Sequence, residues 1–233
     1  MLLLGLTWIA RADRAQQGEP LGLFTSLPIM WSESADIADE LRGGQTPHWA
    51  RAVLRQQGRI VPLDVLDAPG GKGPLGQVRR LVIAQPRPLS GAENVALDAW
   101  VRGGGQLLLL ADPALTQESA FPVGDPRRPQ AVVLISPILR HWGLDLQFDD
   151  AQAFGENYRA AQGLSLPVNL PGRFALTGTE HCKLDGDGLL ALCRIGKGRV
   201  VALADAALLE SDGDTEAREK ALSGLLNTAF AAD

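Results

Sequence analysis

Apolar and polar positions form their clearest pattern between residues 80 and 113. Residues 81–84 and 106–111 are short, continuous apolar runs, and the stretch between them carries Leu97 and Val101 at helical spacing. Strands that are apolar on both faces are typical of a parallel sheet covered by helices on both sides. The pattern therefore predicts a parallel strand–helix–strand unit.

Polar residues and glycines mark the ends of the helix in this unit. Ser90 is placed to accept a hydrogen bond from the backbone N–H of Glu93, and the Glu93 carboxylate can reach back to the N–H of Ser90. This pairing is a capping box. Three consecutive glycines at 103–105 supply a left-handed residue for the C-terminal end. The helix is thus expected to lie between Ser90 and these glycines.

The chain on either side of this unit also alternates between strand and helix patterns. Further strands are predicted at residues 21–27, 59–66 and 144–148, and further helices at 48–57, 137–142 and 216–229. Pro62 in the second of these strands indicates an edge position or a bulge. Residues 149–172 show no regular pattern and are predicted to form a loop with at most one helical turn.

Glycine-rich turns separate the strand-like runs near the C-terminus. These runs cover residues 174–177, 182–184, 189–195 and 199–204. Asp187-Gly188 is a strong signal for a two-residue hairpin, so an antiparallel meander is expected here. The predicted fold class is α/β, with a mostly parallel sheet flanked by helices and a C-terminal antiparallel meander, in a single domain over residues 21–233.

The first 20 residues have a different character. Residues 1–10 are apolar but too few to span a bilayer, which takes about 20 residues. Residues 11–20 are polar and resemble a linker. One interpretation is a truncated signal sequence or membrane anchor whose true start lies upstream of Met1. The other is an apolar strand or helix that docks on the domain.

Composition excludes one class of partner. The 233-residue chain has a net charge of −5, and aromatic residues make up 5% of it. Nucleic-acid binding needs a basic face for phosphates, and single-strand binding needs aromatic platforms for the bases. We therefore expect no nucleic-acid partner.

Cys182 and Cys193 lie at equal distances from the predicted Asp187-Gly188 turn, so they are expected to face each other across the hairpin. Counting outward from a two-residue turn places them at a hydrogen-bonded position. One interpretation is a disulfide, which favours an oxidising compartment such as the periplasm. The other is a pair of buried thiols on the core face.

Three stretches of the chain, in order, resemble a known family. They are LSGAENVALDAWVRGGGQLLLLADP, SPILRHWGLDL and IGKGRVVALADAALLE. They resemble the extracytoplasmic domain of gliding-motility-type ABC-transporter auxiliary proteins, over residues 21–230. This resemblance implies a class I glutamine-amidotransferase-like (flavodoxin-like) fold. It also implies permease and ATPase subunits as partners, and a periplasmic or membrane-anchored location, with the cytoplasm as the alternative.

Catalytic groups of true amidotransferases are missing from the expected places. Those enzymes carry a nucleophilic Cys at a strand-to-helix elbow, with a His partner. Here the strands of the central unit end at Gln85-Pro86 and Asp112-Pro113, and both cysteines lie in the tail hairpin. We therefore predict no catalytic residues and no cofactor. No metal site is expected either, because the His and Cys residues lack ligand spacing.

Polar residues stand where four predicted strands end: Ser26, Gln85, Asp112 and Asp205. If these strands are neighbours, the four side chains converge on one edge of the sheet, where open α/β folds bind ligands. One hypothesis is a ligand-binding crevice formed by these residues. The favoured alternative is that each aspartate caps the turn that follows it.

The segment 28–47 follows the first strand and contains Trp31 and Glu33, together with Ser32, Asp36, Asp39 and Glu40. It lies at the same expected edge, which is a weak indication of ligand binding. A solvated acidic loop is the favoured interpretation. Glu210, Asp212 and Asp214 lack the spacing of a calcium-binding loop and are also expected to be solvated.

The sequence thus favours a non-catalytic, amidotransferase-like domain that serves as an auxiliary or interaction module of an ABC-type transport or cell-envelope system. The alternative is a small-molecule-binding or hydrolase-like enzyme that uses Asp112 and Asp205. A purely structural interaction domain without a transporter is a third possibility.

Overall fold

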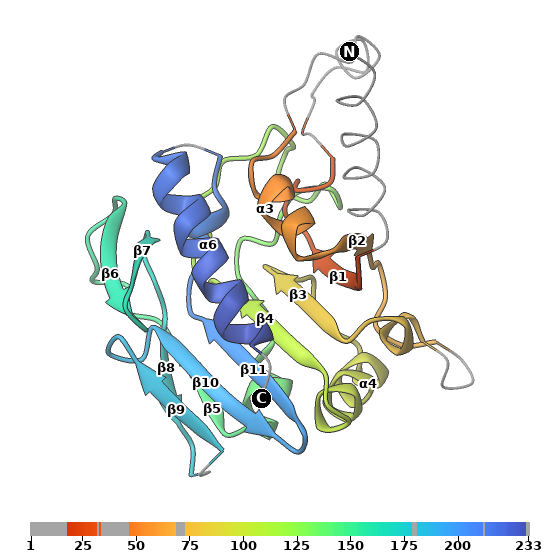
Figure 1. Cartoon of the computed structure of the whole chain (residues 1–233). Helices are drawn as coiled ribbons and strands as arrows, with labels where there is room; N and C mark the ends of the chain where they lie inside the picture. Colours follow the sequence, from red (N-terminus) through yellow and green to blue (C-terminus); the bar gives the residue numbers. More distant parts are fainter. Residues whose placement is uncertain are drawn as a thin grey trace, which may run out of the picture.

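The computed structural model describes residues 18–31, 33, 47–68, 73–178, 181–211 and 213–231. A seven-stranded sheet forms its centre, with strand order β2-β1-β3-β4-β11-β10-β9 (Figure 1). The five strands from β2 to β11 in this order run parallel, β10 runs antiparallel to β11, and β9 runs antiparallel to β10. The chain is therefore a mixed α/β protein with a mostly parallel central sheet.

The strands of this sheet are short, and those between the two edge strands are mostly buried. Their bounds are β1 (Pro20–Thr25), β2 (Arg59–Pro62), β3 (Arg80–Ala84), β4 (Gln106–Leu110), β9 (Cys182–Asp185), β10 (Leu190–Ile195) and β11 (Gly198–Leu203). Strand β2 is at one edge of the sheet, as Pro62 predicts.

Helices cover both faces of the sheet. They are α3 (Ala50–Gln57), α4 (Gly91–Arg102), α5 (Ser136–His141) and α6 (Thr215–Phe230), and the 3₁₀ turns are η1 (Pro74–Gln77) and η2 (Ala207–Leu209). Helices α3 and α6 pack on one face, in front of the sheet in Figure 1, and α4 and α5 pack on the other. Neighbouring strand residues such as Leu23 and Phe24 point into the two different cores, because side chains alternate along a strand.

The strand–helix–strand unit β3–α4–β4 has the predicted form. Ser90 accepts a hydrogen bond from the Glu93 N–H, and the Glu93 carboxylate accepts one from the Ser90 N–H, so the capping box is present. Gly104 supplies the left-handed residue after the helix, with a φ of 114°. Strands β3 and β4 then lie side by side in parallel.

Residues 149–172 do not form the loop that was expected. They contain the antiparallel pair β6 (Asn157–Ala161) and β7 (Leu164–Val168). Gln162 and Gly163 both have positive φ values and join the strands in a tight turn. The hairpin was missed because β6 is mostly exposed, so its side chains show no apolar alternation.

The C-terminal strands follow two different pairings. β9, β10 and β11 are consecutive antiparallel neighbours inside the central sheet. β8 (Arg173–Leu176) instead pairs antiparallel with β5 (Leu144–Gln147) in a separate two-stranded sheet. The run at 174–177 is therefore a strand, but its hydrogen-bonded partner precedes it in the chain.

Cys182 and Cys193 lie directly opposite each other in β9 and β10 and form a disulfide. The predicted hydrogen-bonded position is wrong, because the Arg194 N–H donates to the His181 carbonyl at 2.8 Å. A bond between the residues flanking the cysteines makes the cysteines a non-hydrogen-bonded pair, in which Cα atoms lie closer. Their Cα atoms are 4.0 Å apart.

Some expectations concern residues outside the described ranges. These are the apolar segment 1–10, most of the linker 11–20, and Ser32, Asp36, Asp39, Glu40 and Asp212. Within the ranges that are described, no helix has both the length and the apolar character needed to cross a membrane.

Candidate functional site

Four side chains follow the carboxyl ends of neighbouring parallel strands. Ser26, Gln85, Asp112 and Asp205 come after β1, β3, β4 and β11, which are adjacent in the sheet. Hydrogen bonds link these residues along the edge, directly or through one backbone group. The structure thus brings all four to the place where open α/β sheets bind ligands.

Gln85 holds the first half of this edge together. Its side-chain oxygen accepts from the Asp112 N–H at 2.9 Å, and its amide nitrogen donates to the carbonyls of Asp112 and Gln130 at 3.1 and 2.7 Å. The Ser26 hydroxyl donates to the Gln85 carbonyl at 2.5 Å and accepts from the Gln130 N–H at 3.1 Å. Both side chains are therefore committed to backbone groups.

The two buried aspartates also bind the backbone. Asp112 accepts from the N–H groups of Ala114 at 2.7 Å and Ala206 at 3.1 Å. Asp205 accepts from the N–H groups of Ala207 at 2.5 Å and Asn169 at 3.0 Å. Each carboxylate closes a turn to the residue two positions ahead and ties that turn to a second segment.

Burial changes the proton affinity of this pair. Desolvation raises the pKa of Asp112 to about 6, and the negative charge of Glu210 adds to the effect. Desolvation, followed by the charge of Asp112, raises the pKa of Asp205 well above its usual value. The backbone N–H groups that donate to each carboxylate lower its pKa, because they stabilise the charged form. No cation hydrogen-bonds either carboxylate among the described residues.

These contacts limit the chemistry of the edge. Each of the four carboxylate oxygens already accepts a backbone N–H, as in a turn-capping role. The Ser26 hydroxyl donates to a backbone carbonyl, and the described part of the chain shows no histidine hydrogen-bonded to it. A nucleophile needs a base within hydrogen-bond reach. The observed arrangement therefore stabilises loops and offers no activated nucleophile.

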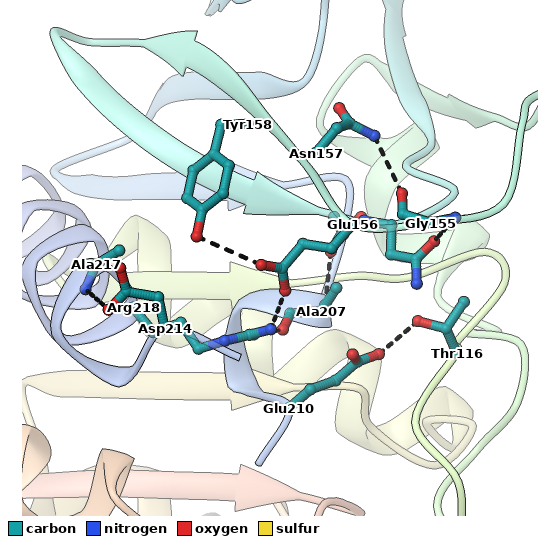
Figure 2. A network of polar contacts seen from close by, with 12 residues as sticks. Thr116, Gly155, Glu156, Asn157, Tyr158, Ala207, Glu210, Asp214, Ala217 and Arg218 are labelled. Atoms are coloured by element: carbon teal, nitrogen blue, oxygen red, sulfur yellow. Dashed lines mark hydrogen bonds and ion pairs between the residues drawn. The ribbon is translucent and has the colours of Figure 1, made fainter. Parts of the chain in front are cut away.

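A second polar network lies beside this edge, around Arg218 of α6 (Figure 2). The Arg218 side chain is buried and donates to the carbonyl of Ala207 and to the carboxylate of Glu156. The Tyr158 hydroxyl donates to the other Glu156 oxygen at 3.3 Å. Arg218 thereby connects α6, η2 and the start of the β6–β7 hairpin.

Arg218 was not predicted from the sequence, although the pattern of α6 contains a signal for it. Arg218 shares one helical face with Ala221, Leu222 and Leu225, which all point into the core. A charged residue on such a face is rarely buried unless it is paired. In the acidic loop that was expected to be solvated, Asp214 is exposed and caps α6, whereas Glu210 is partly buried and its carboxylate accepts from the Thr116 hydroxyl.

Glu93, in the first turn of α4, forms a separate buried polar site. Its two oxygens accept from the Arg87 guanidinium at 2.7 and 2.9 Å, and also from the N–H groups of Ser90 and Leu66. The hydrogen bonds from Arg87 are the largest cause that lowers the pKa of Glu93 to about 2. This carboxylate was predicted as a cap, and its ion pair was not.

Two cavities open near the strand ends. One has a volume of about 220 Å³ and lies at the carboxyl end of β1, which stands between β2 and β3 in the sheet. Ser26, Asp64 and Arg87 form part of its lining. The other, of about 250 Å³, lies between the segments that follow β1, β4 and η2. In the described ranges, His, Cys, Asp and Glu form no group of three that could hold a metal ion.

Fold and site together define a mixed α/β domain whose strand-end side chains are bound to its own backbone. Comparison with protein-family models found no match, and neither did comparison with curated protein sequences. Solved structures do show the fold. The exo-beta-1,4-mannosidase Op5Man5 from Opitutaceae bacterium strain TAV5 aligns with 97% of this chain at 19% identity and a TM-score of 0.55.

Two beta-galactosidases give similar results. The enzyme from Rahnella sp. R3 is 14% identical and that from Bacillus circulans sp. alkalophilus is 13% identical, each over 91% of this chain with a TM-score of 0.51. The chain spans only 38% of the mannosidase and 31% of each beta-galactosidase. At these identities the likeness shows a shared fold within longer enzymes, and the activities are those of the enzymes named.

Proposed function

We propose that this chain is a non-catalytic module with a class I glutamine-amidotransferase-like (flavodoxin-like) fold, which serves an ABC-type transport or cell-envelope system. It binds the membrane-embedded permease and, through it, the ATPase subunits. Its location is the periplasmic face of the membrane, with the cytoplasm as the alternative. The lack of an activated nucleophile at the strand ends, among the residues described, supports a binding role over catalysis.

Exposed aromatic side chains are the main observation that supports the proposal. Of the four exposed aromatics among the described residues, Phe148, Phe154 and Tyr158 fall within one short segment. Phe154 is 77% exposed, which leaves most of an apolar ring in water. Aromatic residues are enriched at protein interfaces relative to the rest of the surface.

The same segment borders a polar cavity. Phe148, Arg159 and Arg173 take part in lining a space of about 460 Å³ between the end of β5 and the β6–β7 hairpin. Aromatic and arginine side chains are the residues that most often dominate binding energy at protein interfaces. The surface thus fits a partner loop that carries both an apolar side chain and a carboxylate.

Co-purification with the transporter subunits encoded beside the gene tests this role. Phe154→Ser should reduce recovery of the permease about tenfold, because a central aromatic contact is worth about 1 kcal/mol or more. Val123→Ser is the matched control, since Val123 is 91% exposed but lies outside the aromatic segment. Equal recovery with both variants contradicts the proposed surface. Absence of neighbouring permease and ATPase genes contradicts the transporter role.

A second candidate is a small-molecule-binding or hydrolase-like enzyme that uses Asp112 and Asp205. The observation in its favour is the raised pKa of both buried carboxyl groups, a common property of functional sites. If it holds, a ligand that raises the melting temperature of the protein should lose this effect in Asp112→Asn and Asp205→Asn. Ligands that stabilise these variants as well as the unmodified protein argue against it.

A further inference from the structure

The cavity of about 460 Å³ beside the exposed aromatic segment has a positively charged lining on an acidic protein. The residues that line it include Gln147, Phe148, Asp149, Gln152, Arg159 and Arg173. Two of these carry a positive charge and one a negative charge, whereas the whole chain has a net charge of −5. All of them belong to the continuous stretch 147–173, which the structure describes throughout. The charge of the lining therefore favours an anionic occupant.

Hydrogen bonds to the backbone hold the walls of this cavity in place. The Gln152 amide donates to the Asp149 carbonyl at 2.8 Å and to the Pro171 carbonyl at 2.9 Å, which ties the loop after β5 to the segment before β8. Gly172, which is buried and also lines the cavity, donates its N–H to the Ala204 carbonyl at 2.7 Å. The cavity is thus anchored to the carboxyl end of β11.

The position of Arg173 is fixed by its neighbours. It lies directly opposite Gln147 in the β5–β8 pair, and its guanidinium donates to the Gln147 side-chain oxygen at 3.3 Å. The stem of its side chain lies against Gly188, where an added Cβ would come within 2.6 Å of Arg173 Cγ. The guanidinium is therefore held beside a neutral residue of the cavity wall. Its remaining N–H groups have no acceptor among the residues described.

Neither arginine of this cavity has a carboxylate partner in the described part of the chain. Arg159 forms no side-chain hydrogen bond or ion pair there, and Arg173 binds only the neutral Gln147. The Asp149 carboxylate lines the same cavity, but it accepts the Ala151 N–H at 3.0 Å and pairs with neither arginine. Other arginines do pair with carboxylates, among them Arg87, Arg102, Arg127, Arg140 and Arg218.

We propose that this cavity receives an acidic side chain of the partner protein, whose carboxylate is bound by Arg159 and Arg173. A guanidinium group has five N–H donors in a planar fork, which matches the two oxygens of a carboxylate. An apolar or aromatic residue next to the acidic one would lie on Phe148, which is 42% exposed. The inference rests on the proposed binding role and names the chemical feature that the partner must carry.

Calorimetric titration of the full chain with two acetylated and amidated pentapeptides, GEFEG and GQFQG, tests the proposal without the transporter. At neutral pH and low salt, GEFEG should bind with a Kd of about 1 mM or lower, at least tenfold more tightly than GQFQG. Arg159→Gln and Arg173→Gln should each weaken its binding about tenfold, since each removes a charge-assisted hydrogen bond. Added salt should weaken it as well, because the site is open to solvent.

Arg55→Gln is the matched control, because Arg55 is an exposed arginine of α3 outside the cavity lining and the net charge changes equally. It should bind GEFEG as the unmodified protein does. Melting temperatures of all variants show that any loss of binding reflects the site and not the fold. The proposal is overturned if GQFQG binds as tightly as GEFEG, if both arginine variants bind normally, or if GEFEG does not bind at about 10 mM.

Co-purification with the permease separates this inference from the proposed function. If GEFEG binds as expected but no permease is recovered, the carboxylate site is supported and the transporter role is contradicted. If the permease is recovered equally with Arg159→Gln, Arg173→Gln and the unmodified protein, the transporter role stands and the carboxylate site is overturned.

Discussion

Glu93 and the Asp112–Asp205 pair are all shielded from solvent but have opposite electrostatic character. Glu93 is 2% exposed, and both aspartates are 0% exposed. The pKa of Glu93 is lowered to about 2, whereas that of Asp112 is raised to about 6. Two differences account for this: Arg87 binds both oxygens of Glu93, whereas the aspartates accept only backbone N–H groups and are more strongly desolvated.

This contrast shows that backbone donors alone do not offset the desolvation of a buried carboxylate here. Charge-assisted bonds from a guanidinium are roughly twice as strong as bonds from neutral donors. At neutral pH the ionised Glu93 therefore stabilises the fold, while the charges of the aspartate pair oppose it. Burying the two charges at the strand-end edge costs free energy. The same two carboxylates close the turns after β4 and β11 and so hold these loops in place.

Neutralising Glu93 should have the largest effect. Because its pKa is lower in the folded state than in the unfolded state, Glu93 stabilises the fold above pH 4.5, and this is lost as pH falls toward 2. Glu93→Gln should lower the free energy of unfolding at neutral pH by about 3 kcal/mol. Urea denaturation at pH 7 and pH 3 measures this. An unchanged difference between the two pH values in the variant contradicts the ion-pair account.

Neutralising Asp112 should act in the opposite pH direction. Its folded pKa is raised, so its contribution to stability is complete below pH 3.8 and is lost as pH rises through about 6. Asp112→Asn cannot titrate, so the fall in unfolding free energy between pH 4 and pH 7 should shrink by about 2 kcal/mol. The measured quantity is the difference between pH 4 and pH 7. The stability at a single pH is not used, because the asparagine side chain has one acceptor oxygen fewer than the carboxylate at every pH.

A matched control for this difference is Asp150→Asn, which changes an exposed aspartate. It should leave the difference between pH 4 and pH 7 as it is in the unmodified protein. If Asp112→Asn behaves like this control, burial does not raise the proton affinity of Asp112, and the contrast with Glu93 fails.

The disulfide should contribute independently of both carboxylate sites. It closes a loop with a sequence separation of 11 residues, so the double variant Cys182→Ala/Cys193→Ala should lose about 2–3 kcal/mol at every pH. In protein from its native compartment, reductant should increase the mass by two hydrogen atoms. No change in mass there means two free thiols, and the prediction of an oxidising compartment is then wrong.

Elements with strong local signals could be predicted from the sequence. The capping box of α4 and the apolar runs of β3 and β4 each specify their structure within a few residues. The four strand-end residues could be placed because parallel strands end at one edge. The partner of β8 could not, because pairing with β5 depends on contacts between distant segments.

Side-chain partners were the least predictable part of the candidate site. Arg87 and Arg218 lie next to acidic residues only after the chain folds, and Arg218 meets Glu156 from 62 positions away. The hairpin that carries Tyr158 was missed since β6 has few buried residues. Local periodicity shows that Arg218 lies on the core-facing side of α6, but it does not identify Glu156 as its partner.

The position of β11 between β4 and β10 has a consequence for how the protein is made. β4 ends at Leu110, and its second neighbour begins only at Gly198. At ribosomal rates of about 5–20 residues per second, the free side of β4 stays unpaired for roughly 5–20 s after synthesis. An apolar strand with open backbone groups is a template for association with other chains. Until residues 198–203 emerge, this edge of the nascent chain is open to such association.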